Sequence, residues 1–229
     1  MKSDGVMVSS RNRPLPRRLA VVVGSFVAFL VVGNLVILGA SAWAQQETPT
    51  APDLPGVGNF ARVDDKLWRG KAPTDEGYRS LAAHGVKTIV DLRAESHVTD
   101  RTAVFDEVGL DLVRLPIRDG QLPSAEQVEE FLAVTERPGR VFVHCGAGVG
   151  RAGTMAATYL VATGQADGWS AMAKNLAVGP PSFEQLAFAA GLDGHDLAGQ
   201  SGLDKPGPLV VAVSRTLDAP RRIWHNLGF

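Results

Sequence analysis

The stretch that decides the fold is "RVFVHCGAGVGRAGT", residues 140–154. Its β-branched and aromatic beginning predicts a buried strand over residues 140–145. Glycines at every second position then predict a tight turn, and residues 151–164 have the composition of a helix. The chain has a single cysteine. The sequence therefore places its only thiol between a buried strand and a glycine-rich turn, six residues before an arginine.

This strand–turn–helix pattern predicts an anion site. The first N–H groups of a helix that begins near Arg151 lack partners within the helix and carry partial positive charge. Gly146, Gly148 and Gly150 let successive N–H groups turn toward one point, which is a cradle for a tetrahedral oxyanion. Cys145 at its rim would be stabilised as a nucleophilic thiolate, and Arg151 could bind two phosphate oxygens. A buried apolar cysteine is the alternative, but these features together favour catalysis.

Strands and helices alternate along the chain on both sides of this loop. The pattern predicts an α/β fold with a central, mostly parallel sheet flanked by helices and the cysteine loop between a strand and a helix. Ligands of such sheets bind beyond the carboxyl ends of the strands, where this loop lies. The predicted strands are 66–70, 86–92, 111–117 and 140–145, and the predicted helices are 74–85, 98–109, 124–139, 151–164, 168–177 and 181–190.

Residues 1–44 are expected to be an N-terminal signal peptide or membrane anchor. The 26 residues from Leu19 to Ala44 carry no charge and would form a helix about 39 Å long, enough to cross a bilayer. The preceding arginines place the N-terminus in the cytoplasm. The small residues around Ala44 resemble a cleavage site, whereas the length suits a retained anchor, so both remain open. Either way we expect export, with the domain secreted or anchored outside the cytoplasm.

The remaining chain is expected to contain a linker at 45–58, one catalytic domain at 59–192 and a C-terminal extension at 193–229. The extension is predicted to pack on the domain as an amphipathic helix, the alternative being a segment that seeks a surface. Residues 45–229 carry 18 basic and 23 acidic side chains. This acidic balance excludes nucleic acid as an expected partner. A membrane is an expected partner only if the N-terminal segment is uncleaved.

The motif "HCGAGVGR", residues 144–151, resembles the HCxxGxxR signature of the cysteine-dependent dual-specificity and protein tyrosine phosphatases. The flanking segments "VDDKLWRGKAPT", "HGVKTIVDLR", "LVRLPIRDG" and "GPPSFEQLAF" resemble exported bacterial members of this superfamily. The resemblance covers roughly residues 60–190. It implies hydrolysis of phosphomonoesters through a phosphocysteine, without metal or cofactor. It also implies a phosphorylated protein or a small phosphomonoester as the substrate.

The resemblance also assigns roles within the loop. Cys145 is the implied nucleophile, and His144 orders the loop. The phosphate is bound by the six residues Gly146, Ala147, Gly148, Val149, Gly150 and Arg151.

Outside the loop, the resemblance implies a general acid on a segment that follows the preceding strand. Asp119, 26 residues before Cys145 and directly before a glycine, fits this place. Asp111 is its rival, but it begins the strand and would lie at the opposite end of the sheet. Gln185 is a candidate for positioning water. Asp91 and Arg93 are expected to form an ion pair that holds loops.

One position departs from the common pattern. Ala152 follows the arginine, where most members of the superfamily carry a serine or threonine whose hydroxyl assists breakdown of the phosphocysteine. We therefore expect a slow second half-reaction. The leading prediction is a tyrosine or dual-specificity phosphoprotein phosphatase. The alternatives are a weakly active phosphopeptide-binding module and a phosphoinositide phosphatase, the latter disfavoured by a loop without lysine.

Overall fold

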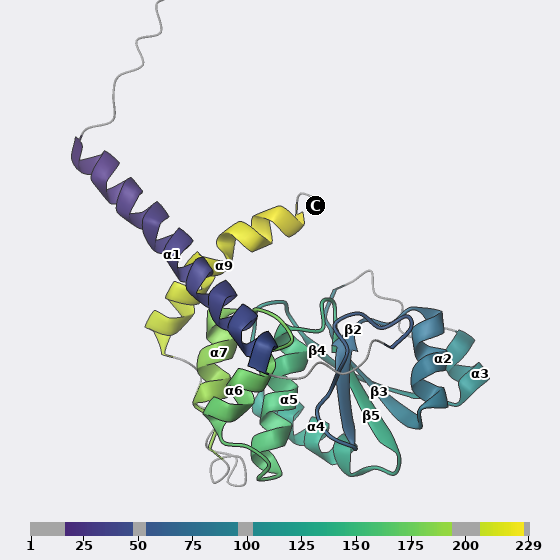
Figure 1. The fold of residues 1–229 in the computed structure, drawn as a ribbon. Helices are drawn as coiled ribbons and strands as arrows, with labels where there is room; N and C mark the ends of the chain where they lie inside the picture. The colour runs from purple at the N-terminus through teal and green to yellow at the C-terminus, as the bar shows by residue number, and fades with distance from the viewer. Residues whose placement is uncertain (1–16, 48–53, 96–102, 194–206, 227–229) are drawn as a thin grey trace, which may run out of the picture.

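The computed structural model describes residues 17–47, 54–95, 103–193 and 207–226. Strands and helices alternate through the central part of the chain, as predicted (Figure 1). The strands are β1 (Ala61–Arg62), β2 (Leu67–Lys71), β3 (Val86–Arg93), β4 (Asp111–Ile117) and β5 (Arg140–Cys145). The helices are α1 (Arg17–Glu47), α2 (Asp75–Ala83), α3 (Ala103–Val108), α4 (Ala125–Glu136), α5 (Gly150–Ala162), α6 (Gly168–Leu176), α7 (Phe183–Ala190) and α9 (Pro208–Asn226).

The sheet has the strand order β1-β2-β5-β3-β4. Only β1 is antiparallel to its neighbour, and the β2–β5, β5–β3 and β3–β4 pairs are parallel. The predicted α/β fold with a mostly parallel sheet is confirmed. The strand that carries the cysteine is central, and its register pairs Lys71 of β2 with Cys145. The carboxyl ends of β2, β3 and β5 therefore meet at one edge.

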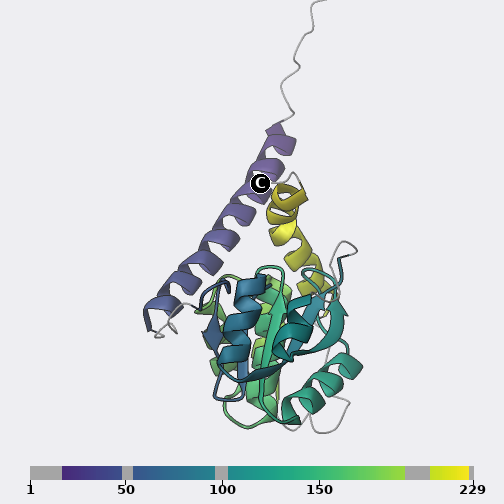
Figure 2. The ribbon, with the colours of Figure 1, turned by 90° about the vertical axis from the view of Figure 1, so that its right-hand side faces the viewer.

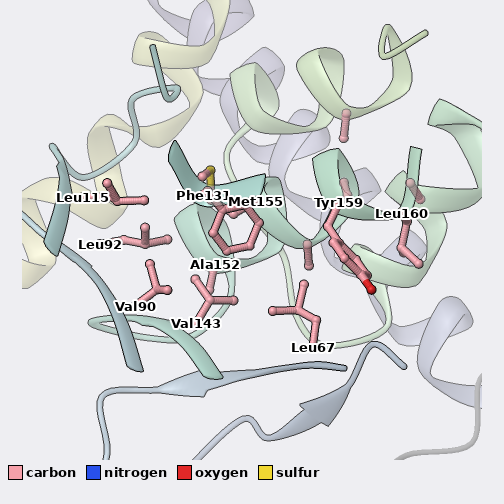
Figure 3. Close-up of a cluster of buried hydrophobic side chains, with 14 of the residues drawn as sticks. Leu67, Val90, Leu92, Leu115, Phe131, Val143, Ala152, Met155, Tyr159 and Leu160 are labelled. Atoms are coloured by element: carbon pink, nitrogen blue, oxygen red, sulfur yellow. The ribbon is translucent and has the colours of Figure 1, made fainter. Parts of the chain in front are cut away.

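Two apolar cores cover the two faces of the sheet. The larger core packs α4, α5, α6 and α7 against one face, and it includes Val143 of β5, Phe131 of α4 and Met155 of α5 (Figure 3). The smaller core packs α2 and α3 against the other face around Phe105. Because both faces are covered, the sheet strands are nearly continuous apolar runs, which explains why they were recognisable in the sequence.

Local sequence signals account for the helix starts. Thr74 caps α2, and Ser124 with Gln127 forms a capping box at α4. A second capping box joins Ser182 and Gln185 at α7. The predicted helix 98–109 is described only as α3, because residues 96–102 lie outside the described part of the chain.

The C-terminal end of α1 and helix α9 lie against the α6–α7 side of the domain, and the rest of α1 projects away from it (Figures 1 and 2). The final third of α1 contacts α6, and α9 contacts both α7 and α1. Leu217 of α9 is 4% exposed, and its carbonyl accepts a hydrogen bond from Asn34 of α1. The described part of the C-terminal extension is thus a helix packed on the rest of the protein.

The linker boundary differs from the expectation. α1 continues to Glu47, and residues 54–58 form part of the domain rather than a linker. Leu54 and Val57 are buried in the smaller core, and the Gly56 carbonyl accepts a hydrogen bond from the Thr74 N–H. Proline and glycine content suggested a linker here, but these residues form a turn that covers apolar side chains.

Candidate active site

The candidate site is the loop between β5 and α5. Cys145, the last residue of β5, is buried, and the Gly148 N–H donates a hydrogen bond to its Sγ at 3.2 Å. Val149, at the N-cap of α5, makes no side-chain hydrogen bond to the helix. The described residues therefore leave the N–H groups at the start of α5 for an anion.

Close packing against β2 explains the central glycine of the loop. Gly148 has a φ of +78°, a conformation that side chains rarely adopt. A Cβ at this position would lie 2.3 Å from both the Gly70 carbonyl carbon and the Lys71 nitrogen. Only glycine allows the loop to approach the β2 backbone this closely.

Arg151 lies with its guanidinium inside the site and is 3% exposed. Nη1 donates to the Ile117 carbonyl at 2.9 Å, and Nη2 donates to Oε1 of Glu95 at 2.9 Å. Burial opposes the charge, but Glu95, Cys145 and Asp119 together raise the pKa of Arg151 above its ordinary value. Its Nε is buried and has no partner among the described residues. A phosphate oxygen would satisfy this donor.

Asp119 reaches the same guanidinium from the segment after β4. Its Oδ1 lies 3.3 Å from Nη2 of Arg151, and its side chain is 72% exposed. Asp111 is the first residue of β4, at the other end of the strand. The structure thus brings Asp119, and not its rival, to the cysteine loop.

His144 lies beneath the loop with a fully buried ring. Burial lowers the pKa of His144 to about 4, although the nearby Asp91 acts in the opposite direction. The ring is therefore neutral at pH 7, and the 3.8 Å between Nδ1 and Oδ1 of Asp91 is not an ion pair. Asp91 instead pairs with Arg93 at 2.8 Å, which confirms the predicted ion pair.

Gln185 contacts the loop from the first turn of α7. Its Oε1 accepts a hydrogen bond from the Ser182 N–H at 3.1 Å, so this oxygen already serves the capping box. A Cβ on Gly150 would lie 2.5 Å from the same oxygen. The buried glutamine therefore packs directly on the loop backbone, where it can also face a bound water.

Two charged residues at the site were missed by the sequence analysis. Glu95 binds Arg151 through both carboxylate oxygens, at 2.9 and 3.3 Å. Arg69 of β2 donates to the Gly148 carbonyl at 3.1 Å. Arg69 lies within the segment "VDDKLWRGKAPT", and Glu95 follows the segment "HGVKTIVDLR". Neither segment contains a sequence signal that its charged residue reaches the loop. Their contacts depend on neighbouring strands rather than on spacing in the chain.

The chain is similar to several curated proteins. It is 41% identical over 99 residues to the chloroplastic NAD kinase 2 of Arabidopsis thaliana, covering 39% of this chain and 10% of that protein. It is 38% identical over 79 residues to the dual specificity protein phosphatase CDC14B of Mus musculus, covering 34% and 16%. It is 28% identical over 159 residues to the dual specificity protein phosphatase TpbA of Pseudomonas aeruginosa, covering 68% and 66%. The match thus spans about a tenth of the NAD kinase relatives.

The fold is also similar to solved phosphatase structures. The core catalytic domain of the PP-IP phosphatase SIW14 from S. cerevisiae, in complex with citrate, aligns with a TM-score of 0.53 at 16% identity. That alignment covers 66% of this chain and 93% of the other. PTPMT1 in complex with PI(5)P aligns with a TM-score of 0.51 at 18% identity, covering 62% and 98%. These likenesses concern the fold.

A sequence model of one family covers most of the domain, including the cysteine loop. Its description is "DSP-PTPase phosphatase fused to NAD+ Kinase", and it matches residues 53–190. The chain belongs to this family, within the cysteine-dependent dual-specificity phosphatase superfamily.

Proposed function

We propose that the chain is a cysteine-dependent phosphatase that hydrolyses phosphomonoesters through a phosphocysteine. The observation that supports the proposal is the cysteine loop itself: the Gly148 N–H holds the Cys145 sulfur, no side chain caps the start of α5, and the buried Nε of Arg151 has no partner among the described residues. A thiolate, a cradle for a dianion and a planar donor that follows the developing charge are what phosphoryl transfer needs.

The proposed reaction has two steps. The Cys145 thiolate attacks phosphorus, the P–O bond to the leaving group breaks, and protonated Asp119 donates its proton to the departing oxygen. Water then attacks the phosphocysteine, Asp119 accepts its proton, and the P–S bond breaks to give inorganic phosphate and the thiolate. Arg151 and the loop N–H groups stabilise the equatorial oxygens in both steps.

The first test is hydrolysis of p-nitrophenyl phosphate by the full chain in detergent with EDTA present. We expect turnover by the wild type and none by Cys145→Ser. A wild type without turnover would contradict the enzyme proposal and favour a phosphopeptide-binding module. Turnover by the serine variant would contradict the assigned nucleophile.

For the substrate class, we propose phosphorylated protein. The interior of the loop, residues 146–150, carries no basic side chain that would select a second phosphate. The matched assay compares phosphotyrosine and phosphoserine peptides with a phosphatidylinositol monophosphate in mixed micelles. Higher kcat/KM on a peptide is expected, and higher kcat/KM on the lipid would overturn the choice.

We further propose that α1 stays attached as a membrane anchor. It is the one described helix long and apolar enough to cross a membrane. Its final third belongs to the domain, because the buried Ser41 donates a hydrogen bond to the Leu176 carbonyl at 2.7 Å and Ala44 is 4% exposed. The apolar stretch from Leu19 to Val36 is largely exposed apart from its contact with α9 at Asn34, and it would still span about 27 Å. Cleavage after Ala44 would remove buried side chains from the fold.

Cell fractionation with N-terminal sequencing tests this anchor. We expect the chain in the membrane fraction with residues 17–47 attached, and digestion of its catalytic domain by protease added to spheroplasts. A soluble form that begins at Gln45 would contradict the anchor. A protease-resistant domain in spheroplasts that are intact would contradict the proposed orientation.

A further inference from the structure

Arg69 is a buried cation directly beneath the cysteine loop. It lies on β2 and is 3% exposed. Its Nη2 donates to the carbonyls of Gly148 and Val149 at 3.1 and 3.3 Å, and its Nη1 donates to Oδ1 of Asn175 at 2.9 Å. These acceptors are neutral, and no ion pair joins Arg69 to a carboxylate within the described part of the chain.

A buried charge without a counter-ion is unfavourable. Burial lowers the pKa of Arg69 to about 10, and the charge of Cys145 acts in the opposite direction. The guanidinium nevertheless stays protonated at neutral pH. Cys145 is the group whose negative charge would favour the protonated guanidinium.

The geometry links the two groups through one residue. Gly148 accepts the hydrogen bond of Arg69 with its carbonyl and donates its N–H to the Cys145 sulfur. Arg69 thus fixes the residue that holds the sulfur, and it adds positive charge on the carbonyl side of the loop. Arg151, in contrast, is held by Glu95 and Asp119.

We propose that Arg69 is a positioning residue for the nucleophile: it holds the loop carbonyls in place and stabilises the Cys145 thiolate as its buried counter-ion. This inference rests on the proposed role of Cys145. It predicts that the charge of Arg69 sets the pH at which Cys145 becomes reactive, apart from any effect on substrate binding.

The test uses the single cysteine of the chain. Alkylation of the full-length protein in detergent by iodoacetamide, followed by intact-mass spectrometry between pH 4 and 9, reports Cys145 alone. We expect Arg69→Met to raise the midpoint of reactivity by about one pH unit, and Arg69→Lys to raise it by less because the charge is kept. Arg62→Met removes an exposed cation from β1, and we expect it to leave the midpoint unchanged.

A second variant supplies the counter-ion without touching Arg69. Asn175→Asp is nearly isosteric and places a carboxylate at the 2.9 Å contact with Nη1. We expect it to raise the midpoint by about half a pH unit, because it neutralises the guanidinium. The other titratable or charged groups around Cys145 are Arg151 of α5 with Glu95 and Asp119, Lys71 of β2, the neighbouring His144, and the Asp91–Arg93 pair of β3. All of them are unchanged in every variant.

The outcomes separate the proposals. An upward shift of the alkylation midpoint in both Arg69→Met and Asn175→Asp supports the counter-ion role. If Arg69→Met does not fold, the Asn175→Asp variant still tests it. If Asn175→Asp and Arg69→Lys fold, lose thermal stability and still have the alkylation midpoint of the wild type, the counter-ion role is overturned. Arg69 would then be a structural residue only. Wild-type protein whose Cys145 is unreactive below pH 9 would instead contradict the proposed nucleophile.

Discussion

Two buried arginines lie at the cysteine loop, and they differ in what surrounds their charge. Arg151 and Arg69 are both 3% exposed. Arg151 contacts two carboxylates, Glu95 and Asp119, whereas Arg69 contacts only carbonyl and amide oxygens. The first is oriented by its partners for an incoming anion. The charge of Arg69 is not balanced by a carboxylate among the described residues, so it can stabilise the Cys145 thiolate. Equal burial of the same residue type therefore supports two different roles.

The largest expected effect comes from Arg151→Lys. An ammonium keeps the charge but cannot bind two phosphate oxygens and Glu95 in one plane. We expect kcat/KM for p-nitrophenyl phosphate to fall by roughly 10³-fold. In the same assay, Arg69→Lys should lower kcat/KM by about tenfold or less, because Arg69 does not contact the substrate. Equal losses would remove the distinction between the two arginines.

Asp119→Asn is expected to lower kcat by about 10²-fold on an alkyl phosphate, because the leaving oxygen then departs without a proton. The loss should be smaller on p-nitrophenyl phosphate, whose leaving group needs less protonation. Asp111→Asn is the matched control at the far end of β4, and it should keep wild-type rates. A uniform loss on both substrates would assign Asp119 to orienting Arg151 rather than to acid catalysis.

His144 is the third buried base at the loop, and unlike the two arginines it is neutral. Its pKa of about 4 in the folded protein lies below the ordinary value of 6.5, so the unfolded chain binds the extra proton first as the pH falls. The stabilisation present above pH 6.5 is therefore lost between pH 6.5 and 4. We expect wild type to lose about 3 kcal/mol relative to His144→Gln over this range.

Urea unfolding of the full chain in detergent at pH 7, 5.5 and 4 measures this difference. The exposed His84, changed to Gln, is the control and should follow the wild type. A constant gap between wild type and His144→Gln at all three values would show that folding does not change the pKa of His144.

Glu95→Gln neutralises one of the two carboxylates that distinguish Arg151 from Arg69. Burial would raise the pKa of Glu95, but its bonds with Arg151 hold it below the ordinary value. The neutral amide keeps the shape and loses the ion pair, so Arg151 is less firmly oriented. We expect kcat/KM to fall by about tenfold. An unchanged kcat/KM would show that Glu95 does not orient Arg151.

The smallest effect is expected at Ala152, which is buried in the same core as Cys145 (Figure 3). Thr154 does not replace the missing hydroxyl, because its Oγ1 donates to the Gly150 carbonyl at 3.1 Å. Phosphoenzyme should accumulate in the wild type, seen as a burst in rapid-quench assays. Ala152→Ser should raise turnover by a few-fold. No burst, with turnover unchanged in the variant, would contradict a slow second half-reaction.

Sequence periodicity was sufficient for β2 to β5 and for most helices, because strands covered on both faces are rich in apolar residues. The two-residue edge strand β1 was not predicted. Periodicity was also insufficient at residues 54–58, where turn-forming residues pack as part of the core. Among site residues, Asp119 was found through its place after a strand. Glu95 and Arg69 were not, because each meets the loop only through sheet neighbours.

The sequence by itself determined the α/β class, the cysteine loop and the arginine that follows it, since local spacing and backbone chemistry fix a strand–turn–helix. The tertiary structure alone decided which charges face that loop. The strand order β2-β5-β3 brings Arg69 of β2 to Gly148 and Glu95, which follows β3, to Arg151 of the same loop. Long-range strand pairing, and not proximity in the chain, set the electrostatics of the site.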